Sequence, residues 1–129
     1  MTEIAEPLAK FQSRLRPQGR VMIPVYIREY FGIKDGDFVV VIIRIPDESR
    51  NIVGRVFAIT KVYDRGVITI PKKIRDKFNL QPGSFVEILL IDYILISSVV
   101  ERKFNLQPTT KYEIIDRDTE TLLLKRERA

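Results

Sequence analysis

The sequence predicts a mostly β protein with short helices, built from repeated strand–helix–strand units. Residues 66–88 combine strand, short-helix and turn signals in one unit, and sliding the chain by 47 residues places residues 19–39 on it. Each unit spans only about 40 residues, near the size at which an isolated core fails. Because the chain contains no cysteine and no histidine, disulfides and the usual zinc sites cannot stabilise such units. We therefore expect the units to share one core.

The second copy begins as a strand from Val67 to Ile70 and continues as a helix of about two turns. Pro71 suits the first helical position, where the backbone amide needs no intrahelical partner. Ile74 and Phe78 then form an apolar stripe at i and i+4. Residues 81–84 have the proline and glycine of a type II turn. A helix this short is stable only when it packs against another element.

The first copy places Gly19 on Gly66 and Gly32 on Asn79. Gly32 and Asn79 both suit the left-handed position that follows a helix, which favours glycine or asparagine. This agreement of residue types at conformationally demanding positions indicates two copies of one unit.

A weaker third copy is found by sliding the second copy by 26 residues, which places residues 77–82 on 103–108. In this copy Ser97 stands in place of Pro71, and Glu101 stands in place of Arg75. We expect it to keep a structural role and to lack the function of the arginine. It would either pair with its equivalent from another chain or cover an exposed strand edge.

The other elements follow from alternation of apolar and polar residues and from turn residues. We expect residues 1–8 to form a frayed arm, residues 116–119 a turn, and Lys125 to begin a charged, solubilising tail. Phe38–Ile45 is almost continuously apolar, which predicts a strand covered on both faces. The full set of expected strands is Ala9–Leu15, Val21–Ile23, Phe38–Ile45, Ile52–Val62, Phe85–Ile91 and Tyr93–Val99 in a tight hairpin about Asp92, Tyr112–Ile115 and Leu122–Leu124, with a hinge helix at 24–31.

Composition narrows the possible functions. The net charge is +5 and the isoelectric point is about 9.6, which suits a polyanion but is also common in proteins without such a partner. No apolar run approaches the length of about 18 residues that spans a bilayer, and the acidic N-terminus does not resemble a signal peptide. We expect a cytoplasmic protein that does not bind membranes. Paired carboxylates, a Gly-rich phosphate loop and a metal-ligand cluster are absent from the sequence, so we expect no enzymatic activity and no cofactor.

The motif of the first copy is Gly19-Arg20-Val21-Met22-Ile23-Pro24, then Ile27-Arg28, Gly32-Ile33 and Gly36-Asp37-Phe38-Val39. It closely resembles the AbrB/SpoVT looped-hinge-helix family, and with the weaker copies the resemblance covers most of the chain from about Lys10 onward. The resemblance implies a swapped-hairpin β-barrel in which two units interleave their strands. It also implies a nucleoid-associated transcriptional regulator that forms a dimer or a larger homo-oligomer and binds double-stranded DNA through basic residues near the hinge helices.

On this basis the chain divides into an N-terminal arm at 1–9, a first repeat at 10–61, a second repeat at 62–99, and a degenerate third repeat at 94–129 that shares a strand with the second. Whether the repeats interleave within one chain or between chains stays open at this point.

Arg20 and Arg28 occupy the basic positions of the family in the first copy. Arginine suits them because its planar fork can pair with a phosphate or with a guanine edge. The alternative is that each arginine is a solvated surface charge or part of a salt bridge within the barrel. Family members often carry a second arginine after the helical one, whereas this chain has Glu29 there, and Asp76 in the second copy.

Lys72 and Lys73 lie in the first turn of the second helix, where the helix dipole penalises a cation by about 0.3–1 kcal/mol. Either they meet an anion, or they are exposed lysines tolerated at small cost. Tyr26 and Tyr30 could stack on a nucleic acid or donate to its phosphates, but on so short a helix Tyr30 more often packs on a neighbour. The complete set of candidate DNA-binding residues is Arg14, Arg16, Arg20, Arg28, Lys61, Arg65, Lys72, Lys73 and Arg75, extended along the N-terminal strand by Lys10.

Two other functions remain open. An antitoxin similar to MazE or VapB would bind DNA through its barrel and a toxin through a flexible tail, but the C-terminal region here reads as ordered β structure. A structural or protein-interaction module without DNA binding would agree with Glu29, Asp76 and the modest net charge.

Overall fold

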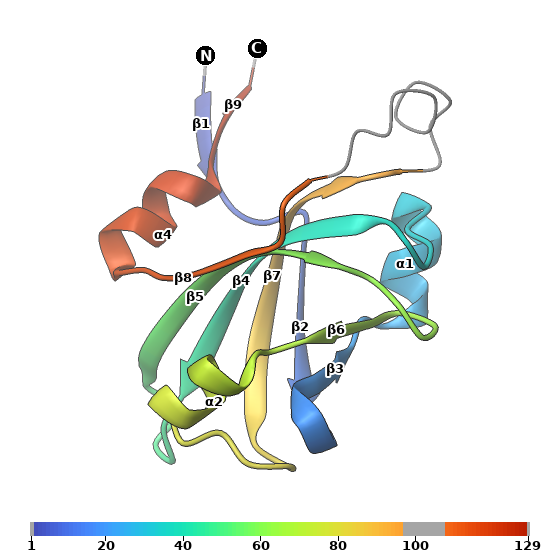
Figure 1. Cartoon of the computed structure of the whole chain (residues 1–129). Helices are drawn as coiled ribbons and strands as arrows, with labels where there is room; N and C mark the ends of the chain where they lie inside the picture. The colour runs from blue at the N-terminus through green and yellow to red at the C-terminus, as the bar shows by residue number, and fades with distance from the viewer. Residues whose placement is uncertain (1, 97–107, 129) are drawn as a thin grey trace.

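A computed structural model of the chain describes residues 2–96 and 108–128 (Figure 1). It is mostly β with short helices, which confirms the predicted fold class. The strands are β1 (Thr2–Ala5), β2 (Ala9–Arg14), β3 (Arg20–Met22), β4 (Phe38–Pro46), β5 (Ile52–Lys61), β6 (Val67–Thr69), β7 (Phe85–Ile94), β8 (Lys111–Ile114) and β9 (Lys125–Arg128). The helices are the short 3-10 helix η1 (Pro17–Gly19), α1 (Val25–Phe31), α2 (Lys72–Lys77) and α4 (Arg117–Leu124).

The main sheet has five antiparallel strands in the order β2-β7-β4-β5-β8, and β3 pairs with β6 in a separate two-stranded ribbon. Figure 1 shows this ribbon crossing in front of the sheet. The core lies between the two layers, where Val21 and Ile68 of the ribbon and Ile43 and Ile88 of the sheet belong to one buried cluster. Among the described residues the strand ladders do not close into a barrel.

The two copies are related by an approximate two-fold axis within the single chain. Val21 lies opposite Ile68 in the ribbon, and Ile42 lies opposite Leu89 in the sheet. The members of each pair are 47 residues apart, so they are equivalent positions of the two copies. An antiparallel ladder that pairs equivalent residues has a local two-fold axis at that pair. The axis therefore passes through the ribbon and the middle of the sheet.

The strands are exchanged between the copies. β2, which leads into the first copy, pairs with β7 of the second, and β5, which leads into the second copy, pairs with β4 of the first. The registers correspond, because Phe11 faces Ile88 in one ladder and the equivalent residues Ala58 and Val41 face each other in the other. Each copy thus completes its sheet with a strand from its neighbour, and the interleaving occurs within one chain.

β8 breaks this two-fold relation. It pairs with Val56–Ile59 on the outer edge of β5, while the equivalent edge of β2 carries no strand in the described part of the chain. The third copy was expected either to meet another chain or to cover an edge, and β8 covers an edge. Residues 97–107, which include most of the motif of that copy, lie outside the described residues.

The outer face of the sheet is covered by α4, which corrects the prediction of a turn at 116–119 and a strand at Leu122–Leu124. Asp116 is the N-cap of this helix, and its carboxylate accepts a hydrogen bond of 2.7 Å from Thr119 N. Glu120 and Leu124, four residues apart, point inward, and Leu124 packs on Ile42 and Leu89. The apolar run was misread because its inward residues have helical spacing, and the capping aspartate went unrecognised.

The tight hairpin predicted about Asp92 is also wrong. β7 runs without a break from Phe85 to Ile94, and the register shift between Val40 and Val41 leaves Ile91 as an extra residue. One aspartate does not supply the two-residue turn of a tight hairpin, and the long partner β4 keeps β7 extended. The part of the predicted hairpin beyond residue 96 lies outside the described residues.

The chain ends pair with each other, so the predicted frayed arm and solubilising tail are corrected as well. Thr2 to Ala5 form β1, which runs antiparallel to β9, from Lys125 to Arg128. The turn and cap predictions are confirmed, since Gly32, Asn79 and Gly83 have φ angles of 70°, 52° and 93°.

Candidate nucleic-acid interface

The surface on the ribbon side of the molecule is called here the hinge face, and it consists of β3, β6, Arg16 with η1, residues 63–66, α1 and α2. In Figure 1 the ribbon passes between α2 at one end and α1 at the other. Two backbone hydrogen bonds join the copies across it, from Ile23 N to Gly66 O at 2.8 Å and from Ile70 N to Gly19 O at 2.7 Å. The residue two positions before each hinge helix is therefore fixed to the loop of the other copy.

Arg28 and Arg75 stabilise this exchange in the same way. The Nε atoms of Arg28 and Arg75 each donate a hydrogen bond of 3.0 Å, to Ile23 O and Ile70 O respectively. A Cβ atom on Gly66 would lie 2.3 Å from Arg28 Nε, and one on Gly19 would lie 2.7 Å from Arg75 Nε. Each arginine therefore lies directly over a glycine of the other copy's loop. The structure places these two candidates in a packing role, with half-buried side chains.

Arg20 lies in β3 and forms a salt bridge within the protein, which was one of the alternatives to a role in DNA binding. Its Nη2 donates to Asp64 Oδ2 at 2.6 Å, and its guanidinium lies 5.6 Å from the centre of the Tyr63 ring. Its side chain is still 32% exposed. Arg20 therefore contributes to the hinge face with its charge largely balanced by Asp64.

Four candidates have exposed side chains on the hinge face, namely Arg16, Arg65, Lys72 and Lys73. Arg16 precedes η1, and its backbone N donates to Arg20 O at 2.9 Å. The backbone N atoms of Arg65 and Gly66 donate to the carboxylate of Asp35, at 2.8 and 3.1 Å. These contacts use backbone groups and leave the cationic ends of the side chains at the surface.

Arg14 and Lys61 do not join this group. Alternation along β2 places Lys10 and Arg14 on the outer face of the sheet, because Phe11 points into the core. The guanidinium of Arg14 stacks 4.2 Å from the centre of the Phe85 ring. Lys61 is equivalent to Arg14 and follows the same alternation along β5. The single basic surface expected from the sequence is thus divided between two faces of the molecule.

Sequence reasoning missed one cation of the hinge face, Lys77. Lys77 is exposed one turn after Lys73 on α2, and its i, i+4 spacing was a usable signal. Tyr26 and Tyr30 occupy the equivalent positions on α1, with exposed fractions of 67% and 83%. The ring of Tyr30 packs edge-on against Phe31, as the packing interpretation predicts, although most of the residue stays exposed.

A partly buried ionic network on the outer face of the sheet, centred on the buried Glu120, was also missed. Arg44 donates two hydrogen bonds to the Glu120 carboxylate, at 2.8 and 2.9 Å, and one to Glu87 at 2.9 Å. Arg55 Nε lies 3.3 Å from Glu120 Oε1. Burial alone would raise the pKa of Glu120, but the hydrogen bonds and charges of Arg44 and Arg55 outweigh it and hold the pKa below its usual value. The network fixes α4 to the sheet.

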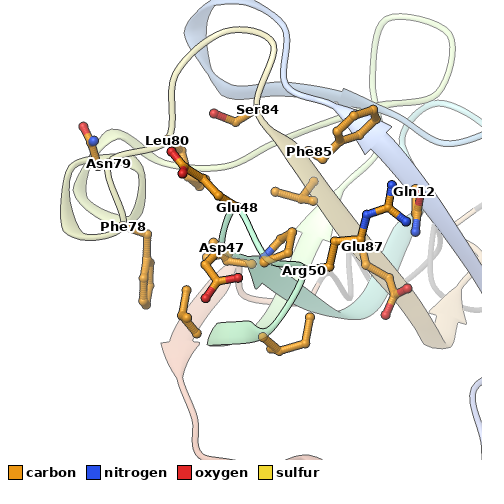
Figure 2. Close-up of a pocket in the computed structure, with 15 residues that line it drawn as sticks. Gln12, Asp47, Glu48, Arg50, Phe78, Asn79, Leu80, Ser84, Phe85 and Glu87 are labelled. Atoms are coloured by element: carbon orange, nitrogen blue, oxygen red, sulfur yellow. The ribbon is translucent and has the colours of Figure 1, made fainter.

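A cavity of about 780 Å³ lies between the β4–β5 turn, the end of α2 and the start of β7 (Figure 2). Most of its lining residues are uncharged, and the charged ones are the acids Asp47, Glu48 and Glu87 and the base Arg50. Asp47 Oδ1 already accepts hydrogen bonds from Ser49 N and Asn51 N, so it belongs to the turn. This cavity does not suit a polyanion and is separate from the exposed cations of the hinge face.

In the described ranges, 2–96 and 108–128, no group of three His, Cys, Asp or Glu side chains is placed to hold a metal ion. None of the helices that the structure describes has the length and apolar character needed to cross a membrane.

Comparison with known proteins relates residues 59–104 to one family model, described as MazE, antidote-toxin recognition, bacterial antitoxin. Among solved structures, the chain is similar to the solution structure of PHS018 from Pyrococcus horikoshii. That similarity has 31% sequence identity and a TM-score of 0.61, and it covers 69% of this chain and 95% of the other. A comparison with curated protein sequences gave no significant match. The chain therefore belongs to one family with this Pyrococcus horikoshii protein and carries a MazE-type domain of the AbrB/MazE superfamily fold.

Proposed function

We propose that the protein is a transcriptional regulator that binds double-stranded DNA with its hinge face. The observation that carries the proposal is the two-fold arrangement, which brings cations from both copies onto one side of the molecule. Arg16, Arg65, Lys72 and Lys73 are exposed there, and Arg20 lies between them on the ribbon. Phosphate contacts by such side chains supply most of the affinity of a protein for duplex DNA.

The arrangement also agrees with the shape of a duplex. The ribbon forms the middle of the hinge face and a short helix lies at each end (Figure 1). Lys72 and Lys73 are exposed on α2, and Arg65 is exposed in the loop beside α1, so the cations follow a line along this face and do not surround a pocket. Three of the four charged residues that line the cavity are acidic, so the cavity does not extend this line of cations. A linear polyanion therefore fits the charge distribution better than a small anionic molecule.

Salt dependence tests the proposal. Affinity for a duplex, measured by fluorescence anisotropy between about 50 and 200 mM NaCl, should fall on a log–log plot with a slope of about −0.9 per neutralised phosphate. Arg16→Ala removes an exposed cation from the hinge face and should reduce the slope by about 0.9. Lys10→Ala is the matched control, because it removes an exposed cation from the outer face of the sheet. Binding that is absent or insensitive to salt would contradict the proposal, as would equal effects of the two substitutions.

An antitoxin function is a second candidate, favoured by the MazE match over residues 59–104. It predicts that the expressed protein co-purifies with a small toxin protein. Residues Lys125–Arg128 form β9 and are paired with β1, so this segment is not free to wrap a toxin. We therefore rank this function second.

A further inference from the structure

The two ends of the hinge face have the same backbone and different chemistry. The α2 end comprises residues 16–19 and 72–78, and the α1 end comprises the equivalent residues 63–66 and 25–31. α2 lies against η1 and α1 lies against residues 64–66, as the arginine–glycine contacts show. Differences between equivalent residues of the two ends are therefore differences in side-chain chemistry and not in backbone fold.

The positions that hold the fold are the same in both ends. Arg28 and Arg75 make identical hydrogen bonds, Gly66 and Gly19 lie beneath them, and Ile27 and Ile74 are buried. Acids follow both arginines, at Glu29 and Asp76. The exposed positions are not part of this shared framework and differ between the two ends.

Those exposed positions differ in a consistent direction. α2 carries Lys72, Lys73 and Lys77, and all three are exposed. The equivalent residues of α1 are Val25, Tyr26 and Tyr30, with exposed fractions of 54%, 67% and 83%. One helix thus presents three ammonium groups and the other presents two phenol rings and an isopropyl group, on the same backbone.

The loops reinforce the difference. Arg16 adds a cation beside α2, whereas its equivalent beside α1 is Tyr63. Asp64 stands next to Arg65, and the carboxylate of Asp35 lies beneath the loop. In total the α2 end has five cations and one acid, and the α1 end has two cations and two acids. The ribbon therefore joins a strongly basic end to a neutral, aromatic one.

We infer that the hinge face binds a DNA duplex in one fixed orientation. The α2 end makes the phosphate contacts, and the α1 end meets the same duplex through Tyr26 and Tyr30 without neutralising phosphates. The inference rests on the proposed function, and it specifies the symmetry of the DNA site, which the proposed function does not determine. Two identical copies would select a palindrome. These unequal copies select a non-palindromic sequence in a fixed orientation.

Reciprocal substitutions test the division of contacts. Lys73→Tyr with Lys77→Tyr gives α2 the side chains of α1, and should reduce the magnitude of the log–log salt slope by about 1.8, from two lost phosphate contacts. Tyr26→Lys with Tyr30→Lys gives α1 the side chains of α2, and should increase it by a similar amount. Both pairs are exposed, so folding should be preserved, which circular dichroism and thermal melting check. Tyr26→Ala with Tyr30→Ala should weaken binding at every salt concentration and leave the slope unchanged. If the variants that replace Tyr26 and Tyr30, with lysine or with alanine, leave both the affinity and the salt slope unchanged, the α1 contact is refuted.

Site-specific cleavage of the DNA tests directionality. Because the chain contains no cysteine, an introduced cysteine is its single labelling site. A consensus is first selected from a random duplex library with the wild-type protein. Lys34→Cys and Gln81→Cys are exposed and equivalent positions near α1 and α2, and each is labelled with iron–EDTA to cleave nearby DNA. Each label should cut only one half of the consensus, and the two labels should cut opposite halves. A palindromic consensus, or cleavage of both halves by each label, would refute the inference. Failure of the wild type to bind any duplex would instead refute the proposed function.

Discussion

Removing the Glu120 carboxylate should destabilise the protein by about 3 kcal/mol, because Glu120→Ala leaves two arginines without their buried partner. The Glu120 side chain is 5% exposed, and those of Arg44 and Arg55 are 24% and 19% exposed. Loss of one partner of a buried ion pair typically costs about 3–5 kcal/mol. We expect the lower end of this range, because Arg44 keeps its contact with Glu87 at 2.9 Å.

Urea unfolding at pH 7, followed by circular dichroism, measures this change, and the melting temperature should fall by about 10 °C. Glu113→Ala is the matched control, because Glu113 forms an exposed pair with Lys111 at 3.2 Å. Such surface pairs contribute about 0–1 kcal/mol. If Glu120→Ala and Glu113→Ala changed the free energy of unfolding by the same small amount, the assignment of Glu120 as the anchor of α4 would be wrong.

Three further predictions concern the fold. Gly19→Ala should destabilise the protein by clearly more than Gly32→Ala in the same urea assay. A Cβ atom at position 19 would lie 2.2 Å from Ile70 O, whereas a Cβ atom at position 32 would have no neighbouring atom within 4 Å, although both glycines have a similar positive φ. Acid should destabilise the wild type below about pH 4.5, since the pKa of Glu120 is lowered by folding and its contribution is lost as the carboxylate becomes protonated. The free energy of unfolding of Glu120→Gln should fall less over that interval, and equal slopes would count against the network. Leu89→Ala, at a position only 1% exposed beside α4, should cost about 2–5 kcal/mol in thermal or urea unfolding, and a cost below about 1 kcal/mol would show that α4 does not cover it.

The parts of the fold that were predictable are those with strong local signals. The positive φ angles of Gly32 and Asn79 follow from residue type at a helix end, and the burial of β4 on both faces follows from its nearly continuous apolar sequence. The exchange of strands could be expected from the repeat and from the small size of each copy. The fold class therefore follows from pattern and size together.

The errors arose where tertiary contacts decide the local conformation. The stretch before Leu124 is apolar enough for a strand, and only the cap at Asp116 and the buried acid Glu120 distinguish a helix docked by ion pairs. The division of the basic residues was hidden for a different reason. Arg14 and Arg16 are two residues apart, but the strand ends between them, so strand alternation does not place them on the same face.

The interleaving within one polypeptide has a consequence for how the protein responds to dilution. A two-fold structure made from separate subunits loses stability as its concentration falls, because each dissociated subunit lacks half of its sheet. In this chain Val21 and Ile68, and Ile42 and Leu89, are joined by the same backbone. The midpoint of its unfolding transition should therefore be the same at nanomolar and micromolar protein, because the two interleaved copies cannot dissociate from each other.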